Sequence, residues 1–481
     1  MNYEPIIGLE VHAQLLTDSK IFCRCKTKFG GEPNSQVCPV CLGLPGVLPV
    51  LNKRAVEFAV RLGLATNCHI APHSIFARKN YFYPDLPKGY QISQFEEPLC
   101  AEGYVEFEVD GKIKRVGLIR IHLEEDAGKS VHAEEYVEEN ETLVDLNRCG
   151  VPLIEIVSKP DIRSPKEAAL YLAQLRQIVQ YLEICDGNME QGSLRCDANI
   201  SVRPAGSSKF GVKTELKNMN TIRGVEKAME LEVSRQIETL EAGRVVAQET
   251  LLWDANKNEI VSMRSKEYSH DYRYFPEPDL VPLQVESDWI DEIRRGLPEL
   301  PLARKQRFIK QYGIPEHDVQ VLIDNRDLAD YFEQVAQNTG DAKTSSNWVR
   351  GEVLRILKEQ QIDIKASAVS AANLAELIKL INNGTISGKI AKSVFEEMRK
   401  TGKSPDAIVE QKGLKQITDS GEIESQVKQV LADNPEEVKK YLSGKEQVLG
   451  FLVGQVMKAT RGKANPKLVN EMLRKELAKL P

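Results

Sequence analysis

Four cysteines in two close pairs are the first residues whose spacing points to chemistry. They occur as Cys23-Arg24-Cys25 and Cys38-Pro39-Val40-Cys41, with a short segment between the pairs. Four thiolates in this pattern can close a tetrahedral zinc site with no open position, so the spacing predicts a structural zinc knuckle over residues 23–41. Two alternatives stay open: four reduced cysteines in loops, or a redox pair, although nothing nearby resembles a thioredoxin-type βα unit.

A second group of polar residues follows the alternating pattern of three predicted strands. In chain order the group consists of Glu10 and His12, then Glu124, Glu125 and Asp126, then Asp197 and Asn199. Carboxylate and amide oxygens with one imidazole suit Mg²⁺ or Mn²⁺. One such pair alone is more often a solvated strand face, but three strands in one domain favour a metal site. Glu125 shares the apolar parity of Ile121 and Leu123, so it meets Glu124 only at a bulge or a strand end.

Cations supply the complement to these acids. Basic and aromatic side chains interleave in the segment 78–90, RKNYFYPDLPKGY, and such a segment can pair with phosphate and stack on a base or ribose. Further cations on or near the polar strands are Lys129, Arg148, Arg195, Lys213 and Lys217. Each of them alone would be an ordinary surface Lys or Arg, and only the group suggests a phosphate-binding surface.

Several familiar catalytic signatures are missing from the sequence. Gly128-Lys129-Ser130 lacks the earlier glycine of a P-loop, and no G-x-G-x-x-G opens a helix after a strand. There is no G-x-S-x-G nucleophile elbow, and no cysteine has an obvious catalytic histidine partner. The chain therefore shows no group that would release ammonia from an amide, and any ATP site would lie on an antiparallel sheet.

The elements that must position these residues are mostly strands in the first part of the chain. The turn Asp110-Gly111 centres a predicted hairpin over 104–123, and Gly206 centres another over 194–217. These pairs predict an antiparallel sheet with one apolar face and one strongly polar face.

Helices interrupt and then replace the strands. A capping box at Ser164 opens a predicted helix to about residue 182, and a second helix is expected over 225–241. Five prolines between 276 and 301 predict a domain boundary, beyond which the periodicity is helical. The predicted fold class is α+β, with an antiparallel-sheet domain over 1–290, an all-α domain over 291–405 and a small helical tail over 406–481.

The charge of the 481-residue chain is unevenly distributed. Residues 361–481 carry a balance of +5 and the rest a balance of −11. An acidic front with a basic tail fits cation chemistry in front and a polyanion partner behind, although ordinary scatter of surface charge is an alternative. No apolar run reaches the ~18 residues of a membrane span, and the start lacks the character of a signal peptide. A cytoplasmic protein with no membrane partner is expected.

Seven longer motifs occur in order along the chain. They are IGLEVH (7–12), RKNYFYPD (78–85), EEDAGK (124–129), DLNRCGVPLIE (145–155), GSLRCDAN (192–199), YRYFPEPD (272–279) and GFLVGQVMK (450–458). Together they resemble the B-subunit family of the GatCAB amidotransferase, which acts on Asp-tRNA(Asn) and Glu-tRNA(Gln). The resemblance covers essentially the whole chain.

The resemblance implies both a fold and a reaction. The front domain is expected to resemble glutamine synthetase and guanido kinases, and the tail to resemble the YqeY family. ATP phosphorylates the side-chain carboxylate of Glu or Asp on the misacylated tRNA, and ammonia then displaces the phosphate to give Gln-tRNA(Gln) or Asn-tRNA(Asn). The A subunit of the heterotrimer is a glutaminase that releases this ammonia from glutamine, and the C subunit is the third member.

Roles for individual residues are expected from the matching motifs together with the cysteine, acidic and basic groups described above. The expected catalytic residues are Glu125, Lys79, Lys88 and Arg195, the last three as clamps for phosphate or acyl phosphate. Expected contacts to ATP or substrate are Tyr81, Tyr90, Lys129, Arg148, Lys213 and Lys217. The expected Mg²⁺ ligands are Glu10, His12, Glu124, Glu125, Asp197 and Asn199, and the expected Zn²⁺ ligands are Cys23, Cys25, Cys38 and Cys41. Expected tRNA contacts in the tail are Lys458, Arg461, Lys463 and Lys467.

Two other classes of function stay open at this point. One is an ATP-dependent ligase of the glutamine synthetase type that acts on a small substrate. The other is a tRNA-binding scaffold without catalysis of its own. Turnover of ATP on free glutamate would favour the first, and absence of ATP hydrolysis with charged tRNA would favour the second.

Overall fold

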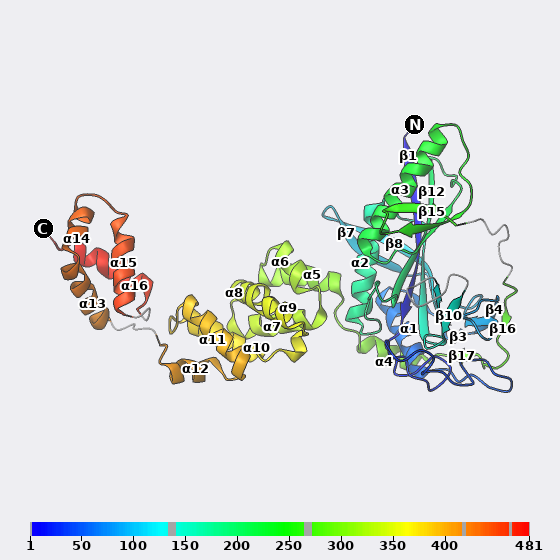
Figure 1. Cartoon of the computed structure of the whole chain (residues 1–481), viewed down its shortest axis with the longest axis horizontal. Coiled ribbons are helices and arrows are strands. Elements are labelled where there is room, and N and C mark those ends of the chain that lie inside the picture. Colours follow the sequence, from blue (N-terminus) through cyan, green and yellow to red (C-terminus); the bar gives the residue numbers. More distant parts are fainter. Residues whose placement is uncertain (1, 133–140, 264–271, 416–419, 461–463, 481) are drawn as a thin grey trace. The chain divides into compact units, whose positions relative to one another are not determined.

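The computed structural model describes residues 2–132, 141–263, 272–415, 420–460 and 464–480. The chain divides into two compact units, residues 1–304 and residues 305–481. The first unit combines a large sheet with helices, and every regular element described in the second unit is helical (Figure 1). The predicted α+β class, with strands in front and helices behind, is therefore confirmed.

A 13-stranded sheet dominates the described part of the first unit. Its centre consists of the antiparallel neighbours β12 (Leu194–Pro204), β1 (Tyr3–Gln14), β11 (Pro152–Ser158) and β8 (Lys112–Glu125). Beyond β12 follow β13 (Thr214–Lys217), β14 (Thr250–Asp254) and β15 (Glu259–Ser262). Beyond β8 follow β5 (Tyr90–Ser93), β4 (Ala77–Asn80) and β16 (Phe275–Pro276).

Shorter strands complete the first unit. Off the main path of the sheet lie β2 (His69–Ile70), β6 (Cys100–Ala101) and β7 (Tyr104–Val109). Two small sheets pair β9 (Lys129–His132) with β10 (Thr142–Asp145), and β3 (His73–Ser74) with β17 (Leu283–Gln284). The expectation of a purely antiparallel sheet is wrong at one place, since β13 and β14 are parallel. The helix α3 (Ile222–Glu241) lies between these two strands in sequence and supplies the crossover that a parallel pair needs.

Local sequence signals account for most element boundaries. Asp110 and Gly111 both have positive φ, 49° and 74°, as the predicted type I′ hairpin turn between β7 and β8 requires. The helix α2 (Pro165–Tyr181) begins after Ser164, whose side chain accepts a hydrogen bond from the Glu167 N–H, as predicted. The helix α3 begins at Ile222 rather than at 225, because Thr221 caps it by accepting from the Gly224 N–H.

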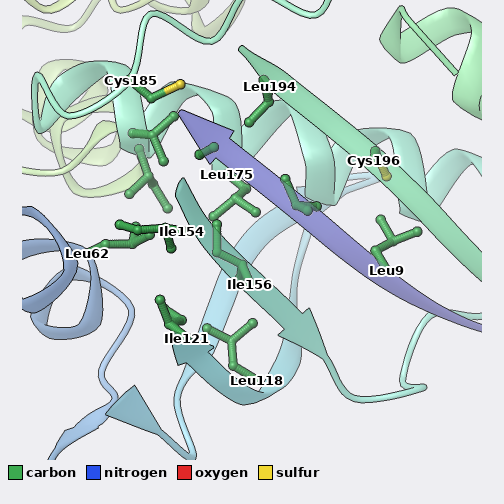
Figure 2. Packing of buried hydrophobic residues seen from close by; sticks show 14 of the residues in the cluster. Leu9, Leu62, Leu118, Ile121, Ile154, Ile156, Leu175, Cys185, Leu194 and Cys196 are labelled. Atoms are coloured by element: carbon green, nitrogen blue, oxygen red, sulfur yellow. The ribbon is translucent and has the colours of Figure 1, made fainter. Parts of the chain in front are cut away.

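The core of the first unit lies on the apolar face of the sheet. Side chains of β1, β8, β11 and β12 gather there with Leu62 of α1 (Lys53–Ala65) and Leu175 of α2 (Figure 2). Leu9 and Ile154 are almost fully buried in this cluster. Because side chains alternate along a strand, packing of this face directs the charged residues of the same strands to the opposite face.

The end of the first unit lies later than the expected domain boundary at residue 290. The helix α4 (Ser287–Arg295) buries Ile293 in the first core and packs Trp289 and Ile290 against it. The ammonium of Lys53 also lies over the Trp289 ring, 5.0 Å from its centroid. These contacts keep α4 with the sheet, and the compact unit ends after residue 304.

The second unit contains two separate hydrophobic clusters. The helices of the first cluster are α5 (Pro301–Tyr312), α6 (Glu316–Leu322), α7 (Arg326–Thr339), α8 (Ala342–Trp348), α9 (Leu354–Gln360), α10 (Ala371–Asn382), α11 (Gly388–Thr401) and α12 (Pro405–Lys412). The second cluster comes from α13 (Ser420–Asp433), α14 (Pro435–Leu442), α15 (Val448–Ala459) and α16 (Pro466–Leu477). Ile408 and Val409 belong to the first cluster, so the core of the tail begins at Ile423 rather than at 406. Among the helices described, none has the length and apolar character that a bilayer crossing requires.

The buried hydroxyl of Tyr171 generates a test of the core. Tyr171 is fully buried in α2, and its hydroxyl has no hydrogen-bond partner among the described residues. We expect Tyr171→Phe to raise the free energy of unfolding by about 1 kcal/mol, because an unsatisfied polar group leaves the core. The matched control is Thr66→Val, since the buried Thr66 hydroxyl donates to the Leu62 carbonyl at 2.8 Å. That change should lower the free energy of unfolding by about 1 kcal/mol, and equal losses in denaturant titrations of both variants would contradict the packing described here.

Candidate functional site

The polar face of the central sheet carries a compact cluster of ligand atoms. The strand register places His12 beside Arg195 on one side and beside Glu155 on the other, and it places Glu155 beside His122. One atom from each of His12, Glu124 and Glu155 lies within 4.8 Å of the others. His12 Nε2 is 3.5 Å from Glu155 Oε2 and 3.8 Å from Glu124 Oε1. Two carboxylates and one imidazole at this separation can hold a divalent cation.

The electrostatics of this cluster favour positive charge. Burial acts to raise the pKa of Glu155, but the hydrogen bond from His12 and the charges of His122, His12 and Arg120 outweigh it and hold the pKa well below its usual range. Burial acts to lower the pKa of His12, but the bond to Glu155 and the charges of Glu124 and Glu155 raise it overall. The cluster thus draws a proton onto His12, and a divalent cation would compete for the same negative potential.

Three other expected metal ligands lie nearby without joining the cluster. Asn199 Nδ2 donates to Glu10 Oε1 at 2.9 Å, and Asp197 Oδ2 accepts from Lys217 Nζ at 3.1 Å. Burial, followed by the negative charge of Glu155, raises the pKa of Glu10. Of the six residues expected around magnesium, His12 and Glu124 are the two that meet in the described part of the chain.

Glu125 does not share a site with Glu124. The pairing of β8 with β11 is regular at this point, with Glu124 opposite Leu153 and Glu125 opposite Pro152, so no bulge brings the two carboxylates to one face. Glu125 Oε1 instead accepts from the Lys88 ammonium and from the Ile92 N–H. The parity of the strand prevails, and the expectation that Glu125 joins Glu124 around magnesium is wrong for this structure.

A small cavity of about 190 Å³ lies where Glu125 and Lys88 meet. Its wall includes Tyr90, which the Lys88 ammonium faces at 5.1 Å from the ring centroid. Cys41 and the buried Lys20 line the same cavity, so the loop of cysteines forms part of its wall. The Glu125–Lys88 pair therefore lies between the sheet and this loop.

The four cysteines converge as their spacing predicted. Their sulfur atoms all lie within 4.8 Å of one another, and Cys38 Sγ and Cys41 Sγ are 3.9 Å apart. A hydrogen bond from Cys23 lowers the pKa of Cys41 to about 4, and the nearby ammonium of Lys20 acts in the same direction. Lys20 Nζ lies 3.6 Å from Cys41 Sγ. Tetrahedral zinc thiolates have this kind of mutual separation, so the four clustered cysteines fit zinc.

A larger cavity of about 840 Å³ adjoins the polar face. Arg195 and Asp197 of β12 form part of its wall, and Met189 and Met219 add apolar surface. Five cations line it: Lys28, Lys129, Arg148, Arg195 and Lys217. Its volume suits a nucleotide-sized ligand. Lys213 is exposed just before β13 and does not line this cavity.

Lys79 and Tyr81 lie in a separate aromatic group. The Lys79 ammonium faces the rings of Tyr272 and Tyr81, at 4.8 and 5.7 Å from their centroids. Burial and the charges of nearby carboxylates, Glu124 first among them, raise the pKa of Tyr81. The three residues expected to clamp phosphate therefore do not lie in one site. Lys79 lies among tyrosines and Lys88 pairs with Glu125, whereas Arg195 lines the large cavity.

Two polar residues of the cluster region were not expected from the sequence as site residues: Glu155, which is largely buried, and His122, which is buried. Asp126, named with the acidic group in the sequence, instead accepts a hydrogen bond from Arg195. Glu155 is the one charged residue in the strand 152–158, and His122 continues the polar parity of Arg120 and Glu124. Those two signals were available in the sequence. In the tail, Lys458 and Lys467 are exposed, whereas Arg461 and Lys463 lie outside the described residues.

Comparison with known proteins identifies the relatives of this chain. A family model described as the GatB/GatE catalytic domain matches residues 5–291, and one described as the GatB domain matches residues 330–477. The chain is 59% identical to a protein of Thermodesulfovibrio yellowstonii over 477 residues, which is 99% of this chain and 100% of the relative. It is 57% identical to a protein of Carboxydothermus hydrogenoformans over 99% of each chain, and 58% identical to one of Geobacter sulfurreducens over 99% of this chain and 100% of the relative. All three relatives are named as the B subunit of aspartyl/glutamyl-tRNA(Asn/Gln) amidotransferase.

The unit with the large sheet is thus the part matched by the GatB/GatE catalytic-domain model, and the helices that follow include the part matched by the GatB domain model. The chain belongs to the family of B subunits of aspartyl/glutamyl-tRNA(Asn/Gln) amidotransferases. It is accordingly one subunit of a tRNA-dependent amidotransferase, and the family expected from the sequence motifs is confirmed.

The cysteine cluster generates a test of zinc binding. We expect one zinc per chain in freshly purified protein, and its loss together with a lower unfolding temperature in Cys41→Ser, because a structural metal contributes folding free energy. The control is Cys185→Ala, which removes a buried cysteine that is not part of the cluster and should retain the metal. Elemental analysis and thermal unfolding measure both quantities. Wild-type protein free of zinc, or a Cys41→Ser variant that keeps it, would refute the assignment.

Proposed function

We propose that the first unit activates and amidates the amino acid carried by misacylated tRNA, with ATP and Mg²⁺. A side-chain carboxylate oxygen of Glu-tRNA(Gln) or Asp-tRNA(Asn) bonds to the γ-phosphorus of ATP, and ADP leaves. Ammonia then bonds to the carbonyl carbon, phosphate leaves and one proton is lost, which yields Gln-tRNA(Gln) or Asn-tRNA(Asn). The proposal includes a front domain related in fold to glutamine synthetase and guanido kinases.

Two neighbouring features carry this proposal. One is the cluster of His12, Glu124 and Glu155, called here the metal-type cluster, and the other is the cavity of about 840 Å³ that five cations line. Arg195 stands beside His12 in the strand register, and the same Arg195 lines the cavity of about 840 Å³. Glu10 stands beside Asp197, which lines that cavity as well. Phosphoryl transfer depends on positioning and charge neutralisation, and this arrangement provides both over the width of two strands.

The donor set fits the metal that the reaction needs. His12, Glu124 and Glu155 would hold Mg²⁺ or Mn²⁺, and their clustering in a region of negative potential supports this assignment. When bound, the metal supplies positive charge to the phosphate oxygens. The chain's own cations complete the neutralisation, since Arg195, Lys217 and Lys129 can each donate hydrogen bonds into the cavity.

Glu125 and Lys88 receive a different role in this proposal. Their cavity of about 190 Å³ is too small for a nucleotide but large enough for a molecule such as ammonia. We propose that Glu125 takes the proton from ammonium that enters there, with Lys88 holding the carboxylate in place. Tyr90 lines that cavity. Tyr81 lies near Glu124 and Glu125, whose charges add to the effect of burial in raising its pKa.

The remaining assignments concern the assembly around the chain. The proposed partners are the glutaminase, or A subunit, which supplies ammonia, and the C subunit, all in the cytoplasm with the tRNA. The zinc of the four cysteines has a structural role, because its four thiolates leave no open position. The basic helical tail contacts the tRNA backbone away from the acceptor end, with Lys458 and Lys467 as two exposed contributors.

A substitution in the metal-type cluster tests this function. In the heterotrimer with its two partner proteins, we expect Glu155→Gln to lower ATP-dependent amidation of Glu-tRNA(Gln) by roughly 10²-fold, because a ligand and its charge are lost. Basal glutamine hydrolysis by the glutaminase should persist. The control is Glu106→Gln, which breaks an exposed ion pair with Arg115 on the same sheet and should leave amidation unchanged.

Two outcomes would count against the proposal. Unchanged amidation in Glu155→Gln would remove the cluster from the reaction. ATP turnover by the wild-type complex on free glutamate without tRNA would instead indicate a ligase for a small substrate.

A further inference from the structure

Asp126 is a buried carboxylate whose oxygen atoms are both occupied. Its Oδ1 accepts from Arg195 Nη2 at 2.9 Å and from the Ala127 N–H at 3.0 Å. Its Oδ2 accepts from Gln14 Nε2 at 2.6 Å and lies 3.5 Å from Arg148 Nε. The residue is 3% exposed and directly follows the end of β8. Three hydrogen bonds and the ion pair with Arg148 thus hold both oxygen atoms of this carboxylate within the protein.

The two arginines around Asp126 use their guanidinium groups differently. Arg148 donates from Nε to the Ala127 carbonyl at 3.0 Å and from Nη2 to the Gly128 carbonyl at 2.6 Å. Arg148 therefore secures the chain that follows Asp126. Arg195 makes one hydrogen bond within the described part of the chain, the bond to Asp126, and its remaining N–H groups are available at the cavity wall.

The contacts around Asp126 suit an orienting role. Arg195 Nη2 and Arg148 Nε lie 2.9 and 3.5 Å from its oxygen atoms, and Gln14 donates to Oδ2 at 2.6 Å. A charged carboxylate fixed on its other side by Gln14 can orient the guanidinium plane of Arg195. A long side chain that is oriented in advance loses less conformational freedom when it binds an anion.

We propose that Asp126 is a positioning residue that aims Arg195 at the phosphate groups of ATP in the large cavity. The inference rests on the proposed function, in which Arg195 contacts phosphate, and adds a residue that touches neither ATP nor metal. It follows from the buried carboxylate held at both oxygen atoms, the hydrogen bond that it accepts from Arg195 and the place of Arg195 in the wall of the cavity. Gln14 supports the same orientation from the far side.

A double-mutant cycle in the assembled amidotransferase tests this coupling. The KM for ATP and the kcat of amidation are measured for Arg195→Ala, Asp126→Asn and the double variant. We expect Asp126→Asn to raise the KM for ATP by roughly ten-fold with a smaller change in kcat, since a charge-assisted bond is lost. The double variant should match Arg195→Ala within about two-fold, because Asp126 acts through Arg195.

A parallel cycle with Arg148→Ala separates positioning from support of the chain. There the coupling between the two effects on KM should be clearly smaller than with Arg195→Ala, because Arg148 is an ion-pair neighbour of Asp126 but donates its hydrogen bonds to the backbone carbonyls of Ala127 and Gly128. Should Asp126→Asn fail to assemble, Gln14→Met replaces it, and a rise in KM that vanishes in the Arg195→Ala background is the expected result.

Each remaining outcome overturns one specific statement. The positioning role is wrong if the effects of Asp126→Asn and Arg195→Ala on KM multiply in the double variant. It is also wrong if Asp126→Asn leaves KM unchanged while Arg195→Ala raises it. In both cases the proposed function stands. If Arg195→Ala changes neither KM nor kcat, the phosphate contact in the proposed function is itself wrong.

Discussion

The antiparallel register of β12, β1, β11 and β8 is the constraint on which the rest of the structure depends. It sets Arg195, His12, Glu155 and His122 side by side across four strands. The same register buries Leu9, Ile154 and their neighbours against α1 and α2. A shift of the register by one residue would turn the charged side chains into the core. The apolar packing and the positions of the charged residues therefore require the same register. The distances within the metal-type cluster are a consequence of this register.

The register also concentrates negative charge. Burial raises the pKa of Glu10, and the negative charges of Glu155, Asp197 and Glu215 act in the same direction because like charges repel. Such repulsion destabilises the folded chain, and nearby cations offset it, with Lys217 placed 3.0–3.1 Å from both Glu215 and Asp197. A sheet face with this negative potential attracts cations. The proposed phosphate activation would therefore use the same carboxylates whose mutual repulsion destabilises the folded chain.

The sequence pattern predicted the faces of the sheet well, because alternation has a direct physical cause. The hairpin at Asp110-Gly111 and the polar face of β12 appear where the pattern placed them. Glu155 escaped notice because β11 is short and almost wholly apolar, so one charge did not stand out as a ligand. Glu125 was expected at magnesium because it follows Glu124 directly in the sequence. Neighbouring residues of a strand point to opposite faces, and the regular pairing of β8 with β11 keeps Glu125 on the face opposite Glu124.

The limits of the compact units differ from the limits expected for the domains. The prolines between 276 and 301 resemble a linker, yet Pro301 opens the helix α5 and α4 packs against the first core. Such packing depends on long-range contacts such as that of Ile293, which no local pattern encodes. The convergence of four cysteines, by contrast, was predictable because their local spacing nearly determines it.

The magnetic coupling between bound Mn²⁺ and an imidazole nitrogen is the measurement that tests this account most directly. Full-length chain in its complex is loaded with Mn²⁺ and examined by pulsed electron paramagnetic resonance for coupling to imidazole nitrogen. We predict a nitrogen signal from one histidine that disappears in His12→Gln and persists in His122→Gln, because His12 belongs to the cluster with Glu124 and Glu155. Bound Mn²⁺ without nitrogen coupling, or coupling that survives the loss of His12, would contradict a metal site built on this sheet.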